Sequence, residues 1–417
     1  MIEGWNIKYT LVFVATTPFA VNSHLRSQIL ALARLYQVVL CVNTLAYSLD
    51  EDIIKAVRVH HIDIARRLAP FRDLGALIQM FLIFKKIRPT VVHSITPKAG
   101  LLGMLAARIS GVPLRFHTFT GQIWANKVGI RRRFLKALDR LIVCCASQVL
   151  ADSVSQCIFL EQEGVARLGG VRVLGKGSIA GVNLSRFRPN AFQRRRIRDE
   201  LRVASDTPIF LFVGRIVRDK GVFDMVEAMV YLNGQYPSWE LWVVGPDEDG
   251  LQDKLQSEGN QRGARIRWFG SSHSPEHFMA VADVLILPSY REGFGSVIIE
   301  AAACATPCIA YEVVGVVDAI IDKYTGLFTK ITGVDGLIDA MRRLGECPDE
   351  VLRLGDAART RVVHEFSSEV VTNLWLKFYA DALDLLFYYC SSFFLRDNVK
   401  HGSFKLLLIF EIVDPLG

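Results

Sequence analysis

The stretch from Asp283 to Glu312, "DVLILPSYREGFGSVIIEAAACATPCIAYE", predicts a strand, a helix and a second strand. The runs "DVLILPS" and "PCIAYE" are short and apolar, as expected of buried strands. Between them, "SVIIEAAACA" contains adequate to good helix formers, and Pro307 ends the helical pattern. Strands joined through a helix in this way pair in parallel, which is typical of α/β proteins.

The same alternation of apolar strands and helical segments runs along most of the chain. Further predicted strands in the first half are "KYTLVFVA", "QVVLCVN", "AVRVHHI", "TVVHSI", "PLRFHTF", "SQVLAD" and "VRVLG"; those in the second half are "PIFLFVG", "ELWVVG" and "RIRWFG". Helical spacing is clearest over residues 97–110 and 131–146. Continuous apolar strands indicate parallel sheets that helices cover on both faces. We therefore predict an α/β fold with two Rossmann-like domains that face each other across a cleft.

The length of 417 residues favours two domains. Prolines and a dense basic run interrupt the strand pattern over residues 183–208, as expected of a linker. We place an N-terminal domain at 1–185 and a C-terminal domain at 186–370. Residues 371–417 are predicted as a returning helix with an apolar tail; a membrane-touching tail and a poorly structured one are the alternatives.

Composition narrows the class of protein. Hydrophobic residues make up 51% of the chain, yet no apolar run is long enough to span a membrane. A formal net charge of +7 suits an anionic partner, such as a phosphate, a nucleotide, anionic lipid or nucleic acid. The eight cysteines form no CxxC pair, so we expect neither a zinc site nor a disulfide framework, and we expect a reducing cytoplasm. The N-terminal segment is expected to be a buried strand rather than a signal peptide.

Two segments of the second half carry groups suited to a phosphorylated sugar. In "REGFGSVIIE", the glycines allow a close approach of backbone to ligand, and the helix start offers free N–H groups to a phosphate. The carboxylates of Glu292 and Glu300 could accept hydrogen bonds from paired sugar hydroxyls. The alternative is that both are ordinary acids at a helix start. In "FVGRIVRDKGV", Arg215 and Lys220 beside a helix start could clamp a diphosphate, or else belong to a solvated basic loop.

The ordered motifs "GRIVRDKG" and "EGFGSVIIEAAACATP" resemble glycosyltransferase family 4, in which paired glutamates have the E-x7-E spacing. The segments "HSITPKAGLLGMLAARISGVP", "FHTFTGQ" and "GKGSIAGVNLSRFRP" resemble bacterial transferases that build lipid-linked surface glycans. The resemblance extends to about residue 380, and it implies an acceptor-side domain at 1–185 and a nucleotide-sugar-binding domain at 186–370. It implies a GT-B fold and a retaining, metal-independent transfer of a hexosyl or N-acetylhexosaminyl group from a nucleotide donor, with no cofactor. The loop "ATTPFAVNSHL" lacks the glycines that the family often has there.

The resemblance also implies roles for individual residues. Arg215 and Lys220 match the diphosphate-binding pair, Glu292 the donor-sugar contact, Glu300 the ribose contact, and His117 the first-domain histidine, for which we expect a positioning role. The full expected set is His117, Arg215, Lys220 and Glu292 as catalytic residues, Gly214, Phe294, Gly295, Ser296 and Glu300 as nucleotide-sugar ligands, and Lys98 on the acceptor side. We expect no metal site, and we interpret the acids of "DEDG" at 247–250 as solvated.

The segment "IRRRFLKALDRLIVCC" predicts a basic amphipathic helix near 131–142. Such a helix could lie on anionic lipid, or could face the core with a solvated basic side.

We expect a cytoplasmic enzyme, peripheral at the inner face of the cell membrane. It would move a sugar from a nucleotide diphosphate donor to a lipid-linked saccharide, and a UDP-sugar is the donor that we expect. The reaction would belong to surface polysaccharide or lipopolysaccharide biosynthesis. We do not expect nucleic acid as a partner. The alternatives are a UDP-sugar epimerase and a non-catalytic nucleotide-sugar-binding protein. "GKGSIAG" departs from the dinucleotide fingerprint, which disfavours a nicotinamide or flavin enzyme.

Overall fold

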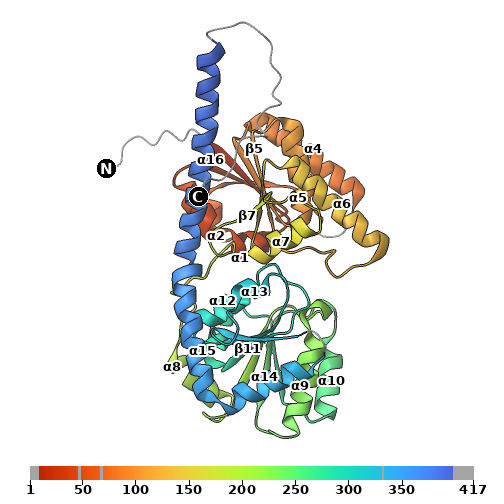
Figure 1. The fold of residues 1–417 in the computed structure, drawn as a ribbon, viewed down its shortest axis with the longest axis vertical. Helices are drawn as coiled ribbons and strands as arrows, with labels where there is room; N and C mark the ends of the chain where they lie inside the picture. Colours follow the sequence, from red (N-terminus) through yellow and green to blue (C-terminus); the bar gives the residue numbers. More distant parts are fainter. Residues whose placement is uncertain (1–8, 46–47, 66–68, 331–332, 398–417) are drawn as a thin grey trace, which may run out of the picture. The chain divides into compact units, whose positions relative to one another are not determined.

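The computed structural model describes residues 9–45, 48–65, 69–330 and 333–397. The chain divides into one compact unit up to Leu374 and a second unit that begins at Trp375. The first unit contains two parallel sheets with helices between successive strands, which confirms the predicted α/β fold (Figure 1). We call the part with β1–β7 the first half and the part with β8–β13 the second half. The domain boundaries at 185 and 370 stay predictions.

The sheet of the first half has seven strands in the order β3-β2-β1-β4-β5-β6-β7, and every neighbouring pair is parallel. Its strands are β1 (Thr10–Ala15), β2 (Gln37–Val42), β3 (Arg58–His61), β4 (Val91–Ile95), β5 (Leu114–Phe119), β6 (Gln148–Ala151) and β7 (Val171–Val173). Its helices are α1 (Pro18–His24), α2 (Arg26–Ala33), α3 (Glu51–Ala56), α4 (Pro70–Ile87), α5 (Pro97–Ser110), α6 (Gly129–Cys145) and α7 (Val154–Gln162). Helix α5 packs against both α4 and α6, and the three form one layer beside the sheet (Figure 1).

The sheet of the second half has six parallel strands in the order β10-β9-β8-β11-β12-β13. Its strands are β8 (Ile209–Val213), β9 (Glu240–Val244), β10 (Ile266–Gly270), β11 (Val284–Leu287), β12 (Cys308–Tyr311) and β13 (Gly326–Thr329). Its helices are α8 (Ala191–Glu200), η1 (Arg218–Lys220), α9 (Val222–Asn233), α10 (Gln252–Gln261), α11 (Pro275–Val281), α12 (Ser296–Ala303), α13 (Val316–Ala319), α14 (Asp335–Glu346), α15 (Pro348–Arg361) and the π-helical η2 (Val362–Phe366).

Strand β8 shows why these strands are apolar throughout. Successive side chains of a strand point to opposite faces of the sheet. Leu211 belongs to the hydrophobic cluster on one face, whereas Phe210 and Phe212 belong to the cluster on the other face. All three side chains are fully buried. Burial on both faces explains the unbroken run "IFLFV".

The region expected to be a linker contains a folded helix, so that prediction is wrong for α8. Its arginines are paired rather than solvated: Arg194 Nη2 and Arg198 Nη2 contact the two carboxylate oxygens of Asp283, at 2.5 and 2.8 Å. Arg198 is buried. Helix α8 also packs against α11, so it belongs to the second half.

The chain crosses between the halves twice, and the two crossings are hydrogen-bonded to each other. Val182 N donates to Phe366 O at 2.8 Å, and Ser368 N donates to Val182 O at 2.8 Å. Helix α16 (Ser368–Asp397) then begins. That this helix returns to the first half stays a prediction. The predicted apolar tail beyond it, residues 398–417, lies outside the described residues. Within the described part of the chain, no helix has the length and apolar character needed to cross a membrane.

Candidate active site

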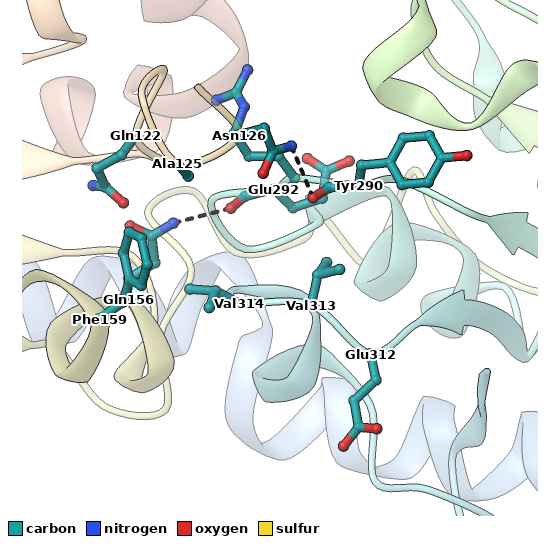
Figure 2. Close-up of a pocket in the computed structure, with 11 residues that line it drawn as sticks. Gln122, Ala125, Asn126, Gln156, Phe159, Tyr290, Glu292, Glu312, Val313 and Val314 are labelled. Carbon is teal, nitrogen blue, oxygen red and sulfur yellow. Dashed lines mark hydrogen bonds between the residues drawn. The ribbon is translucent and has the colours of Figure 1, made fainter. Parts of the chain in front are cut away.

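The loop between β11 and α12 touches the first half through its backbone. Gln156 Nε2 donates to Glu292 O at 3.0 Å, and Asn126 Nδ2 donates to Tyr290 O at 3.2 Å (Figure 2). Ser153 Oγ donates to Gly293 O at 3.1 Å. The three donors follow β5 and β6, at the carboxyl ends of the first sheet. The carboxyl ends of strands from both sheets therefore meet here, where ligands of open α/β sheets bind.

Gly293 allows this contact because it has no side chain. A Cβ at this position would lie 2.6 Å from Thr120 O, closer than real Cβ atoms approach another heavy atom. Any larger residue would push the β11–α12 loop away from the first half. The glycine thus serves a close approach of protein backbone, in addition to the approach of ligand that the sequence suggested.

A pocket of about 280 Å³ lies at this junction. Gln122, Asn126, Gln156 and Phe159 line it from the first half, and Tyr290, Glu292, Glu312 and Val313 from the second (Figure 2). Amide and carboxylate groups beside aromatic residues suit the hydroxyls and the apolar face of a sugar. Of the residues expected from the sequence, only Glu292 lines this pocket.

Lys220 and Glu292 form an ion pair in which Lys220 Nζ contacts Glu292 Oε1. Both side chains are mostly buried, with 19% and 13% exposed. Gly221 follows Lys220 in the left-handed region at φ 67°, where a side chain would collide with Pro288 O. This turn ends η1, starts α9 and presents Lys220 to the loop before α12. The structure thus brings together two residues that lie 72 positions apart in the chain.

Arg215 has a different partner. Its Nη1 contacts Glu248 Oε2 at 2.8 Å, and about half of its side chain is exposed. Glu248 belongs to the "DEDG" stretch. In the same stretch, Asp247 accepts hydrogen bonds from Leu251 N and Gln252 N, both at 2.9 Å, so its carboxylate caps the start of α10. Two of these acids therefore have protein partners, where the sequence suggested that the acids are solvated.

Glu300 lies on α12, is partly buried, and feels charged groups of both signs. Burial raises the pKa of its carboxyl to about 7; Glu276 also raises this pKa, and Arg186 opposes the rise. Arg186 itself pairs with Glu276 at 2.9 Å. The carboxyl of Glu300 therefore titrates near neutral pH, and it can accept hydrogen bonds from hydroxyls most strongly in its ionised form.

Of the expected ligands around the start of α12, Gly295 and Ser296 form the helix start itself, whereas the side chain of Phe294 is buried in the core. Gly295 is the left-handed N-cap residue at φ 78°, and Ser296 begins the helix. Phe294 is buried, and its ring packs 5.3 Å from that of Phe366. The side chain of Phe294 is therefore part of the core, and only its backbone is available to a nucleotide-sugar. Gly214 follows β8, and its N donates to Val244 O at the end of β9.

His117 and Lys98, expected from the first half, both have protein neighbours. His117 is fully buried, its Nδ1 lies 2.9 Å from Ser94 Oγ, and burial lowers its pKa to about 3. It is therefore neutral at physiological pH. Lys98 Nζ contacts Asp73 Oδ1 at 2.7 Å. Thr96 occupies the N-cap position of α5, but its side chain makes no capping hydrogen bond; its Oγ1 lies 2.7 Å from Thr16 Oγ1 instead.

Sequence reasoning missed several groups at the junction. These groups are Gln156, Asp152 and Ser155. The backbone N of Ser155 donates a hydrogen bond to Asp318 Oδ2 at 3.1 Å. Burial raises the pKa of Asp152 well above its ordinary value, and Glu292 and Asp318 raise it further. Asp152 is the last residue of the predicted strand "SQVLAD", and Ser155 lies three positions further on. The rule that ligands bind at carboxyl ends of strands could have singled out this position.

Comparison with known proteins agrees with this architecture. Residues 20–168 match the model of the glycosyl transferase 4-like domain, and residues 193–361 match that of glycosyl transferases group 1. The chain is 29% identical over 316 residues to the capsular polysaccharide biosynthesis glycosyltransferase CapM of Staphylococcus aureus, which covers 75% of this chain and 82% of the relative.

Two further similarities are informative. The chain is 25% identical over 312 residues to the UDP-Gal:alpha-D-GlcNAc-diphosphoundecaprenol alpha-1,3-galactosyltransferase of Escherichia coli, covering 73% of this chain and 78% of the relative. The structure superposes on sucrose-phosphate synthase from Thermosynechococcus elongatus with a TM-score of 0.75 at 21% identity, covering 91% of this chain and 100% of the other.

The two sheets that meet at their carboxyl ends and the superposition on a known transferase define the GT-B fold class. Both halves match glycosyltransferase models over most of their length. The chain belongs to glycosyltransferase family 4, and the predicted family is confirmed.

Proposed function

We propose that this glycosyltransferase moves a hexosyl or N-acetylhexosaminyl group from a nucleotide diphosphate sugar to a lipid-linked saccharide, with retention and without a metal. A UDP-sugar is the donor that we propose. The observation that carries the proposal is the Lys220–Glu292 ion pair, which is mostly buried and lies where the two halves meet. A cation and a sugar-binding carboxylate are thereby next to each other.

The chemistry follows from charge. In the transfer, the bond between the anomeric carbon and the diphosphate oxygen breaks, and a bond from that carbon to an acceptor hydroxyl oxygen forms. The hydroxyl proton passes to the leaving phosphate oxygen. Negative charge gathers on the diphosphate, and Lys220, Arg215 and the N–H groups at the start of α12 would stabilise that charge. Glu292 would hold the sugar, Glu300 the ribose, and neutral His117 would position the donor.

The relatives support the substrate class. The Escherichia coli relative is named for UDP-Gal as donor and a diphosphoundecaprenol-linked saccharide as acceptor. The Staphylococcus aureus relative is named for capsular polysaccharide biosynthesis. On this basis we propose a role in bacterial surface polysaccharide assembly, at the cytoplasmic face of the cell membrane. Lys98 would approach a phosphate of the acceptor.

Helix α6 includes the predicted membrane-touching segment near 131–142. Leu135 and Ile142 pack into the core of the first half, whereas Phe134 is 53% exposed and Arg133 is exposed. Arg132 and Lys136 pair with Glu163 at 2.8 and 2.7 Å. The helix is thus partly core-facing, and we propose that its exposed start contributes positive charge towards lipid.

A transfer assay tests the proposal. Purified protein in EDTA is mixed with labelled UDP-, GDP- or dTDP-sugars and a bacterial membrane lipid extract, and label in the lipid phase is measured. We expect label with a UDP-sugar, lost in Lys220→Ala and Glu292→Gln and retained in the surface control Asp249→Asn. Isomerised donor without acceptor would favour the epimerase instead. Donor binding without transfer or isomerisation would favour a binding protein.

A further inference from the structure

Helix α4 has two apolar sides. Ala76, Met80 and Phe84 are buried against the first half. On the opposite side of the helix, four large apolar side chains follow one another at helical spacing and face solvent. This α4 stripe consists of Phe71, Leu74, Ile78 and Leu82, which are 92%, 55%, 51% and 59% exposed. A solvent-facing helix side normally carries polar residues, so a contiguous apolar stripe indicates an interaction surface.

The charges around the α4 stripe are positive. Lys85, Lys86 and Arg88 are exposed at the end of the helix, and we call them the basic end. Residues 74–88 include no acidic residue. Asp73, in the first turn, is paired with Lys98. An apolar stripe with exposed cations at one end complements acyl chains and anionic headgroups.

The neighbouring helices extend the same character. Helix α5 lies between α4 and α6 in one layer (Figure 1). At the end of α5, Ile109 is 61% exposed and Arg108 is exposed. At the start of α6, Ile130 is 84% exposed, beside exposed Arg131. Apolar and basic side chains therefore recur on all three helices of this layer.

We propose that the α4 stripe docks on an anionic lipid bilayer, with its apolar side chains in the interface and the basic end on lipid phosphates. The inference deepens the proposed function, since it rests on a membrane-borne acceptor. The stripe begins at Phe71, near the Asp73–Lys98 pair, and Lys98 follows the carboxyl end of β4. Docking through α4 thus holds the carboxyl-end side of the sheet, where the halves meet, close to the headgroups.

A bilayer fits this surface better than a second copy of the chain. A stable protein interface typically covers about 800 Å² on each partner with matched shape. The α4 stripe is only one helix wide. A bilayer adapts to such a narrow stripe and supplies negative charge along its whole length.

Vesicle co-sedimentation of the full chain tests the proposal. Vesicles of phosphatidylcholine with phosphatidylglycerol are compared with vesicles of phosphatidylcholine alone. We expect Ile78→Ser with Leu82→Ser to weaken binding to the anionic vesicles about tenfold or more. The matched control is Leu168→Ser with Phe192→Ser, at side chains that are 89% and 76% exposed elsewhere on the surface. The control should bind like the wild type.

A charge series tests the basic end. Lys85→Glu with Lys86→Glu should weaken binding by about fivefold per residue or more, and added salt should reduce the difference. Arg195→Glu with Arg202→Glu, at exposed arginines, is the control. The proposal is overturned if the wild type does not bind, if stripe variants bind as the wild type does, or if controls lose binding equally. A wild-type dimer that the stripe variants convert to monomers, without vesicle binding, would assign the stripe to a second copy.

The two proposals can fail separately. Vesicle binding requires no donor, and transfer can be measured with the acceptor dissolved in detergent. Stripe variants should keep transfer in detergent while losing binding to vesicles. If the wild type transfers sugar in detergent but does not bind vesicles, the docking proposal is refuted and the proposed function stands. Vesicle binding by a wild type that never transfers sugar would refute the proposed function and leave docking standing.

Discussion

The side-chain amide of Gln156, on α7, donates a hydrogen bond to the backbone carbonyl of Glu292 across 3.0 Å. The amide thereby ties the first half to the loop that presents the Glu292 carboxylate to Lys220. Gln156 is buried, so its hydrogen bond does not compete with water. The position of Glu292 depends on a residue 136 positions earlier in the chain.

Gln156→Ala should therefore slow transfer while leaving the fold intact. Loss of one buried hydrogen bond costs about 1 kcal/mol, which corresponds to roughly a fivefold lower rate if the loop position limits the reaction. Steady-state rates of diphosphate release measure the effect. Gln148→Ala is the control, because that amide bonds to Val149 O away from the junction. An equal loss in both variants would contradict the positioning role.

Lys220→Ala should lower transfer by about a hundredfold or more, because it removes the cation beside the proposed diphosphate and leaves the Glu292 carboxylate unpaired. Lys220→Arg should restore part of the rate, since it keeps the charge. Calorimetry gives donor affinity and the transfer assay gives the rate. Lys254→Ala, at an exposed lysine paired with Glu258, should change neither. Unchanged donor affinity and rate in Lys220→Ala would remove this residue from the site.

Donor affinity should depend on the ionisation of Glu300. Because burial raises its pKa to about 7, the carboxyl is partly protonated at neutral pH. If its carboxylate accepts ribose hydroxyls, donor affinity should increase as pH rises through about 7 and then level off. Glu300→Gln, which does not ionise, should bind more weakly and without this rise. Donor titrations from about pH 5 to about pH 9 provide the measurement. A rise that persists in the variant would come from another group.

The stability of the protein should depend on Asp152. Its pKa is higher in the folded state than its ordinary value of 3.8, first because of burial and then because of Glu292 and Asp318. The folded state therefore holds this proton to higher pH than the unfolded state does, and stability falls as pH rises above about 4. Asp152→Asn should flatten this decline. Thermal unfolding at a series of pH values provides the test, with exposed Asp249→Asn as control. If the unfolding temperature declines with pH equally in the wild type and in Asp152→Asn, Asp152 does not cause the pH dependence of stability.

The sequence predicted most of the fold because buried parallel strands are apolar on both faces. It missed β13, "GLFT", which has only four residues, starts with a glycine and lies at the edge of the sheet. It also took the charged residues of α8 for a linker, because their partner Asp283 lies more than 80 positions away. Local patterns do not reveal which distant acid will neutralise an arginine.

The sequence predicted the motif residues of the candidate site but not their partners from the other half. Lys220 and Glu292 stand in two motifs that are readable as phosphate- and sugar-binding loops, and the structure pairs them. Asp152 could have been singled out only by its place at the carboxyl end of a predicted strand. The partners Gln156 and Asp318 carry no local signal, because their roles arise from contact between the two halves. The burial of Phe294 was also hidden, since it depends on Phe366, which is far along the chain.

The side-by-side crossings near Val182 and Phe366 have a mechanical consequence. The two segments are hydrogen-bonded to each other, so any rotation of one half against the other would have to move them together, as a single hinge. Phe366 belongs to that hinge, and its ring packs against Phe294, two residues from Glu292. Opening the halves would therefore also pull on the loop that carries Glu292. Entry of the donor and disassembly of the Lys220–Glu292 pair would then be one movement, and closure would rebuild the site around its substrate.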